Sequence, residues 1–174
     1  NTEAIIGLTG GAEYDVYFVA EDGVQNLQAT PVKVDLVTQT PYAVWSAGAG
    51  FDVDSNGDGI DNGIAFLLGA AGPNTDASGL LPAVGEDGGN LVMEFDCLAA
   101  AERGNAVLNL QYDGDLVAPW TSALVPDQIG NSTVGNVSFV VTAGPGSLLH
   151  VVATVDDDAE AVGGKLFGRL EGTE

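Results

Sequence analysis

The stretch "NVSFVVTAGPGSLLHVVATV", residues 136–155, sets the fold class that the sequence predicts. Apolar residues occupy alternate positions from Val137 onward in its first half, and from Leu149 onward in its second half. Alternation of this kind is typical of a β-strand with one buried face. Gly and Pro residues at 144–146 separate the two runs, as expected of a turn. The stretch therefore predicts two β-strands.

The same pattern recurs on both sides of this stretch. Strands are predicted in "NLVMEFDCL" (90–98), "NAVLNLQYDG" (105–114) and "KLFGRLEG" (165–172). Near the start of the chain, "AEYDVYFVAEDG" (12–23) and "LQATPVKVDLVTQT" (27–40) predict a β-hairpin. Strands joined by turns rich in Gly, Asp and Asn favour a mainly β fold built as an antiparallel β-sandwich. A lone hairpin cannot bury its own apolar face, so residues 1–40 are expected to need a covering partner.

The charge of the chain limits its partners. Twenty-five acidic residues against four basic ones give a formal net charge of −21 over 174 residues. Binding to nucleic acid requires clustered Lys and Arg, so nucleic acid is excluded as a partner. No apolar run approaches the length of about 20 residues that a membrane-spanning helix needs, so we expect no membrane insertion. A divalent cation is the natural complement to such a charge.

An acidic loop, "FDVDSNGDGIDNG" (51–63), predicts where that cation binds. Oxygen-bearing side chains occupy alternate positions and lead into Gly59, the glycine that a calcium loop of the EF-hand type needs at its sixth position. Short helices are expected before the loop, from Thr40–Pro41, and after it, up to about Gly69. The candidate ligands for Ca²⁺ are the side chains of Asp52, Asp54, Asn56, Asp58 and Asn62 and the backbone carbonyl of Ile60.

The twelfth position of the loop departs from the calcium pattern. It holds Ala65 in place of the bidentate Glu, so Asp61 or an acid from another strand is needed to complete the coordination. Loss of that Glu predicts a dissociation constant of roughly 10⁻⁴ to 10⁻³ M, which suits extracellular calcium. The alternative interpretation is a solvated Asn/Asp/Gly turn that binds no metal. Magnesium is less favoured because it demands octahedral geometry and retains several waters.

Two resemblances extend this reading. "YAVWSAGAGFDVDSNGDGIDNGIAFLLG" (42–69) resembles the calcium segment that precedes a C-terminal β-domain in many large secreted or surface-anchored bacterial proteins, although Phe66 replaces its Tyr and Ala65 its Glu. "LVMEFDCLAAAERGNAVLNLQYDGDLVAPW" (91–120) and "GKLFGRLEG" (164–172) are similar to later strands of that module. "LTGGAEYDVYFVAEDGVQN" (8–26) resembles the last two strands of a fibronectin type III-like domain. A dockerin is less favoured, because dockerins carry two such loops.

Three segments follow from these patterns and resemblances: a fibronectin type III-like hairpin (1–40), a helix–calcium loop–helix (41–72) and an antiparallel β-sandwich (73–174). The resemblances imply a calcium-stabilised structural module, extracellular or at a bacterial cell surface, and no catalysis. We expect a subunit of a filament, matrix or surface assembly held by strand complementation, through self-association into a homopolymer or contact with neighbouring β-domains. The alternative is a C-terminal spacer, adhesion or carbohydrate-binding fragment of a large secreted enzyme or adhesin, although nothing in the sequence supports carbohydrate binding.

The remaining side chains that could react or bind a metal ion are predicted to have structural roles. Cys97 alternates with polar neighbours and is expected to be a small buried residue on a strand. His150 is the only histidine and is expected to be an ordinary strand residue, since no second histidine accompanies it. The run Asp156–Asp158 is either a second cation site or, as we favour, a solvated acidic turn.

Overall fold

The computed structural model describes residues 5–156 and 162–174. By their contacts, these residues divide into two compact units with the boundary between Pro41 and Tyr42. The first unit contains the predicted hairpin. The predicted segments 41–72 and 73–174 both lie in the second unit, apart from Pro41 itself.

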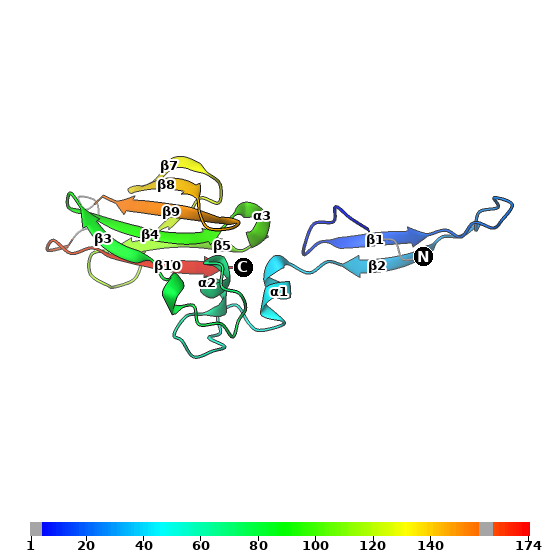
Figure 1. The fold of residues 1–174 in the computed structure, drawn as a ribbon, viewed down its shortest axis with the longest axis horizontal. Helices are drawn as coiled ribbons and strands as arrows, with labels where there is room; N and C mark the ends of the chain where they lie inside the picture. Colours follow the sequence, from blue (N-terminus) through cyan, green and yellow to red (C-terminus); the bar gives the residue numbers. More distant parts are fainter. Residues whose placement is uncertain (1–4, 157–161) are drawn as a thin grey trace. The chain divides into compact units, whose positions relative to one another are not determined.

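The first unit is an antiparallel pair of strands, β1 (Glu13–Phe18) and β2 (Val32–Val37), shown in blue in Figure 1. Because side chains alternate between the two faces of a strand, the register gathers apolar residues on one face and charged residues mostly on the other. What we call the apolar face consists of the cross-strand pairs Tyr14–Leu36, Val16–Val34 and Phe18–Val32. The opposite face consists of Glu13–Val37, Asp15–Asp35 and Tyr17–Lys33.

No described residue of the first unit is buried. On the charged face, the Lys33 ammonium lies 3.0 Å from the Asp15 carboxylate and 2.8 Å from that of Asp35. At the start of β1, the Tyr14 hydroxyl accepts a hydrogen bond from the Thr9 amide at 2.8 Å. This contact is similar to the tyrosine corner of immunoglobulin-like sandwiches, in which a tyrosine hydroxyl bonds to the backbone a few residues upstream.

The second unit is built from two antiparallel sheets and short helices (Figure 1). Its five-stranded sheet has the strand order β3-β4-β9-β8-β7, and its three-stranded sheet has the order β10-β5-β6. The strands of the larger sheet are β3 (Ala83–Asp87), β4 (Asn90–Leu98), β7 (Gly130–Val134), β8 (Val137–Ala143) and β9 (Leu148–Val155). Those of the smaller sheet are β5 (Val107–Asp113), β6 (Thr121–Leu124) and β10 (Phe167–Thr173).

One hydrophobic core lies between the two sheets. The alternation predicted from the sequence is realised in it, because every second side chain of β8 and β9 is buried. The larger sheet contributes Met93, Phe95, Cys97, Val137, Phe139, Val141, Leu149, Val151, Ala153 and Val155, and the smaller sheet contributes Leu108, Leu110, Tyr112 and Ala123. The structure therefore confirms a mainly β fold made of antiparallel sheets with few, short helices.

The helices are α1 (Pro41–Ser46), α2 (Asn62–Leu67), the 3₁₀ turn η1 (Ser78–Leu80) and α3 (Ala100–Arg103). Aromatic rings connect α1, the acidic loop and α2. The Tyr42 ring lies 4.8 Å from the Phe51 ring, at a tilt, and 5.4 Å from the Phe66 ring, edge to face, measured between ring centroids. The Trp45 indole lies 5.5 Å from the Phe66 ring and donates a hydrogen bond to the Ala70 carbonyl. This cluster fixes both ends of the acidic loop to the sandwich core.

Three strands were not predicted from the sequence. The sequence patterns indicated no strand in residues 71–90, yet this segment contains β3, which pairs with β4 through a two-residue turn at Gly88–Gly89. Both glycines have positive φ, as a tight hairpin turn of this type requires. β6 and β7 were also missed. β3 and β7 are edge strands without a buried residue, so their sequences carry no alternation of buried apolar positions.

Candidate metal centre

The acidic loop spans residues 51–61, between α1 and α2, and its shape is set by backbone contacts with α2. The Asn62 amide donates to the Val53 carbonyl at 2.9 Å, and the Gly63 amide donates to the Phe51 carbonyl at 2.8 Å. Gly63 is required at its position, since a Cβ there would lie only 2.0 Å from the Phe51 ring. The chain is thereby folded back so that the alternating oxygens occupy one compact turn.

Asp54 organises the centre of this turn. One oxygen of its carboxylate accepts from the Gly57 amide and the other from the Gly59 amide, both at 2.8 Å. Both glycines have positive φ, a conformation that is strained for residues with a side chain. Because a carboxylate oxygen can accept more than one bond, each oxygen of Asp54 retains capacity toward a cation.

Asn56 and Asp58 are joined directly. The Asn56 side-chain amide donates to Asp58 Oδ2 at 3.0 Å and to the Thr75 carbonyl at 2.7 Å. The carboxylate of Asp58 also accepts from the backbone amides of Ile60, at 2.9 Å, and Ala77, at 2.7 Å. The bond from Ala77 is the main reason that the pKa of Asp58 lies below its ordinary value. Asp58 is therefore held as an anion.

Asp52 lies elsewhere. With Asp61, it lines a hollow of about 300 Å³ whose other walls come from β10, including Arg169 and Glu171. The Arg169 guanidinium stacks 4.4 Å from the Trp120 ring centroid, and its Nε donates to Gln111 at 2.8 Å. Asp61 occupies the N-cap position of α2, but its side chain caps no backbone amide. Hydrogen bonds thus link Asp54, Asn56 and Asp58 in one turn, whereas Asp52 and Asp61 share a different surface.

Asn62 is a structural residue in this fold. Its side chain is buried, with 1% of its surface exposed, and its amide nitrogen donates to the Gly50 carbonyl and the Ser55 hydroxyl, both at 2.9 Å. Asn62 also contacts Tyr42. Burial raises the pKa of Tyr42, and the smaller effect of the hydrogen bond with Asn62 lowers it. Asn62 therefore fastens the loop to α1, in a position where sequence spacing predicted a calcium ligand.

Ala65, at the twelfth position of the loop pattern, faces an apolar cluster. It is buried against Ile60, Ala70 and Ala77, so a carboxylate here would lose water without gaining a charged partner. The structure thus gives the physical reason for the missing Glu: the first turn of α2 packs inward, and any further ligand must come from outside it.

Residues 75–77 are the contribution that sequence reasoning missed. The Thr75 carbonyl and the Ala77 amide contact Asn56 and Asp58 across 19 positions of sequence. Asp76 lies between them. Hydrogen bonds with Ser78 lower the pKa of Asp76, and the nearby charge of Asp58 opposes this effect in part. Its surroundings, rich in Gly, Asn and Asp, are typical of a turn and gave no indication of these contacts.

The donor chemistry of the turn fits a hard cation. Asp54, Asn56 and Asp58 present oxygen atoms, the ligand type that Ca²⁺ prefers, and Asp76, whose pKa responds to the charge of Asp58, can supplement them. Among the described residues, no group of three or more His, Cys, Asp or Glu side chains is arranged closely enough to hold a metal ion. Binding would therefore require Asp76 or water to complete the shell.

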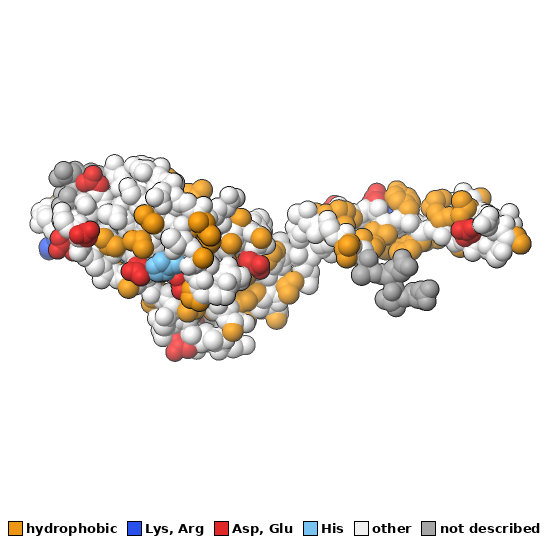
Figure 2. Space-filling model, turned by 45° about the horizontal axis from the view of Figure 1, so that its top comes forward, with side chains coloured by type: hydrophobic (Ala, Val, Ile, Leu, Met, Phe, Trp, Pro, Cys, Tyr) orange, Lys and Arg blue, Asp and Glu red, His pale blue; other side chains and the backbone are white. Residues whose placement is uncertain are grey.

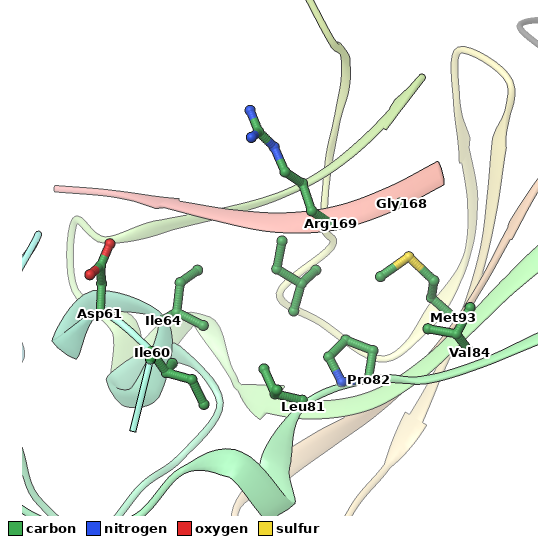
Figure 3. A pocket seen from close by; sticks show the side chains of 11 residues that line it. Ile60, Asp61, Ile64, Leu81, Pro82, Val84, Met93, Gly168 and Arg169 are labelled. Atoms are coloured by element: carbon green, nitrogen blue, oxygen red, sulfur yellow. The ribbon is translucent and has the colours of Figure 1, made fainter. Parts of the chain in front are cut away.

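A second hollow, of about 440 Å³, adjoins the loop and is shown in Figure 3. Apolar side chains from α2, β3 and β4 line it, among them Ile64, Val84 and Met93. Asp61 lies at its edge, and Arg169 extends away from the apolar side chains. The hollow offers no paired acid and base or nucleophile, so its chemistry is that of a small apolar contact surface.

Cys97, on β4, is fully buried, which confirms the expected structural role. Burial raises the pKa of its thiol, and the Arg103 guanidinium, 3.0 Å from the sulfur, opposes this effect. A protonated, inaccessible thiol is a poor nucleophile. The run Asp156–Asp158 falls largely outside the described residues, which end at Asp156 before the gap.

Comparison of the chain with protein-family models, with curated proteins and with solved structures gave no match. Within residues 5–156 and 162–174, no helix is long and apolar enough to span a membrane.

Proposed function

We propose that this chain is a calcium-stabilised structural β-module of an extracellular or bacterial cell-surface assembly, in which the β1–β2 hairpin associates with another copy. One observation carries the proposal: the apolar face of the hairpin is formed, and the described part of its own unit holds no second sheet to cover it. On it, Phe18 is 55% exposed, Val32 52% and Val34 44%. Figure 2 shows hydrophobic side chains, in orange, along this unit.

Burial of the apolar face is the driving force for association. A single β-hairpin is marginal in water, and burial of apolar surface contributes about 25 cal/mol per Å². Both β1 and β2 also present a free backbone edge, since each pairs only with the other among the described residues. A free edge can template pairing with a strand from a second molecule, and repetition of such a contact builds a filament.

The calcium loop supports the same function in two ways. A bound cation reduces the repulsion between chains that each carry a formal charge of −21. The loop also lacks the bidentate Glu, with buried Ala65 in its place, which favours the weak affinity suited to extracellular calcium. We assign Ca²⁺ to Asp54, Asn56 and Asp58, with the Ile60 carbonyl as the backbone ligand.

Two variants of the same strand test the association. Val34 lies on the apolar face and Val37 on the charged face, so Val34→Asp and Val37→Asp add the same charge to opposite sides. Mass photometry in millimolar Ca²⁺, over a range of concentrations, should show oligomers for the original chain and for Val37→Asp, and monomers for Val34→Asp. A monodisperse monomer for the original chain, or equal association of both variants, would overturn the proposal.

Calcium is tested separately, in thermal unfolding experiments. With a dissociation constant of about 1 mM, 10 mM Ca²⁺ should stabilise the chain by about 1.4 kcal/mol. Asp54→Asn combined with Asp58→Asn should abolish this increase. The control pair, Asp113→Asn with Asp115→Asn, alters a similar acidic turn elsewhere, where Asp113 accepts from the Asp115 amide. If the control pair loses as much of the calcium effect, the assignment to the loop is wrong.

The contact that is similar to a tyrosine corner favours a second function. The bond from the Thr9 amide to the Tyr14 hydroxyl is formed although the residues described for this unit include no second sheet. In this alternative, the hairpin belongs to a neighbouring β-domain, and residues 42–174 act as an ancillary spacer, adhesion or binding module of a larger secreted protein. A monomeric chain that still binds calcium is the result that favours it.

A further inference from the structure

His150 lies between two carboxylates on the outer face of the larger sheet. It pairs with Asp96 in the register of β9 and β4, and Glu94 lies two positions away on β4. The distance is 2.8 Å from imidazole Nδ1 to Asp96 Oδ1 and 3.3 Å from Nε2 to Glu94 Oε1. Acidic and histidine side chains meet at the surface in Figure 2. The side chains are 33% exposed for His150 and 55% exposed for Glu94, so solvent reaches both.

The contact with Asp96 decides which nitrogen of the imidazole carries the proton. An ionised carboxylate only accepts hydrogen bonds, so a 2.8 Å contact with Nδ1 places the proton there. In the neutral ring, Nε2 then presents a lone pair toward Glu94, which is also an acceptor. Two acceptors at 3.3 Å repel each other unless a cation, either a proton or a metal ion, lies between them.

We propose that His150 Nε2 and the Glu94 carboxylate bind a Zn²⁺-type divalent metal ion, with Asp96 as the residue that orients the imidazole. Two ligands of a tetrahedral zinc ion, with bonds of about 2.0–2.1 Å, lie about 3.3 Å apart. The observed separation of Nε2 and Glu94 Oε1 is 3.3 Å, longer than the ~2.7–2.9 Å usual for a charge-assisted hydrogen bond. An ion pair between Glu94 and a protonated imidazole also fits this separation, and the ring signals measured below distinguish it from a bound metal ion.

The surroundings are consistent with a metal site. A carboxylate that accepts from the second nitrogen of a histidine fixes the tautomer and raises the basicity of the ligand nitrogen, a common arrangement around zinc. A hollow of about 230 Å³ adjoins the three side chains, with Leu80 and Leu81 among its other walls, and leaves room for coordinated water. Two protein ligands and two waters complete a tetrahedral shell. This site differs from the calcium loop in its ligands, because an imidazole nitrogen favours zinc over calcium.

Isothermal titration of the whole, EDTA-treated chain with ZnCl₂, in excess CaCl₂ to occupy sites made only of oxygen, tests the proposal. We expect one zinc ion per chain. His150→Gln should remove this binding, and Glu94→Gln should weaken it at least tenfold. Asp96→Asn should weaken it by about 10- to 100-fold, because both ligands remain and only the orienting carboxylate is lost. Glu86→Gln, on the neighbouring strand β3, removes an acid outside the cluster and should leave the affinity unchanged.

A second measurement does not depend on variants. In the original chain, Zn²⁺ should shift the NMR signals of the His150 ring at stoichiometric concentration, whereas Ca²⁺ should not. Zinc affinity that is the same in the original chain and in His150→Gln would overturn the proposal, as would ring signals that respond to protons but not to zinc. Circular dichroism of His150→Gln checks that a loss of binding is not a loss of fold.

Discussion

The hairpin and the sandwich of this chain follow the same alternation of apolar and polar residues, yet they differ completely in burial. Phe139 on β8 is 1% exposed, and Phe18 on β1 is 55% exposed. Each lies on the apolar side of its own sheet. The sandwich supplies a second sheet to cover that side, and the unit that contains the hairpin has no second sheet among its described residues. The alternation therefore specifies which face is to be buried, while the cover must come from a second sheet.

The largest expected effect comes from testing this pair of phenylalanines. Phe139→Ala should reduce the free energy of unfolding by about 3–5 kcal/mol, because it leaves a cavity between the sheets. Phe18→Ala should change it by less than about 0.5 kcal/mol in the monomeric chain, since its side chain already contacts water. Urea denaturation at low protein concentration measures both. A large loss of stability for Phe18→Ala in a monomer would mean that the hairpin is covered by its own chain.

A smaller effect is expected where the acidic loop contacts α2. Gly63→Ala places a methyl group against the Phe51 ring, which is held by Tyr42, and should cost about 1–3 kcal/mol. Gly72→Ala is the matched control, because a Cβ there meets no atom within 4 Å and Gly72 needs no positive φ. In thermal unfolding experiments in EGTA, only Gly63→Ala should melt at a lower temperature than the original chain. Equal effects of the two substitutions would show that Phe51 can move and that the loop is not rigidly held.

The same contrast explains how far the sequence predicted the structure. Strands with a buried face, such as β8 and β9, were predicted because burial selects apolar residues at every second position. The edge strands β3 and β7 were not, because a strand without buried residues shows no such selection. A similar limit applied to β6, which has only four residues.

The candidate sites show a related limit. The spacing of Asp54, Asn56 and Asp58 indicated a common turn because loop geometry is local. Local spacing gave no indication that Asn62 would be buried, since its burial depends on how the start of α2 packs against the rest of the loop. Likewise, the register that brings His150 to Asp96 joins positions 54 residues apart.

The smallest expected effect concerns the charge of Asp58 and is best measured by its pH dependence. The pKa of this carboxyl lies below its ordinary value of 3.8 because the Ala77 amide and other donors stabilise the anion. A group with a lowered pKa in the folded state contributes stability above its unfolded pKa, and this contribution disappears as the pH falls through the folded value. Asp58→Asn mimics the neutral form, so the variant should melt a few degrees below the original chain at pH 6.

The difference in melting temperature should shrink as the pH falls below the ordinary value of 3.8 and through the lower folded pKa, where the carboxyl of the original chain takes up its proton. Melting curves in EGTA remove any contribution from calcium. Asp61→Asn controls for the loss of one negative charge in the same loop, because that side chain caps no backbone amide. A difference for Asp58→Asn that stays constant over the whole acid range in which the original chain remains folded would mean that the bond from Ala77 does not depend on the charge of Asp58. The loop and residues 75–77 would then be held together by uncharged contacts, such as the hydrogen bond from the Asn56 side chain to the Thr75 carbonyl.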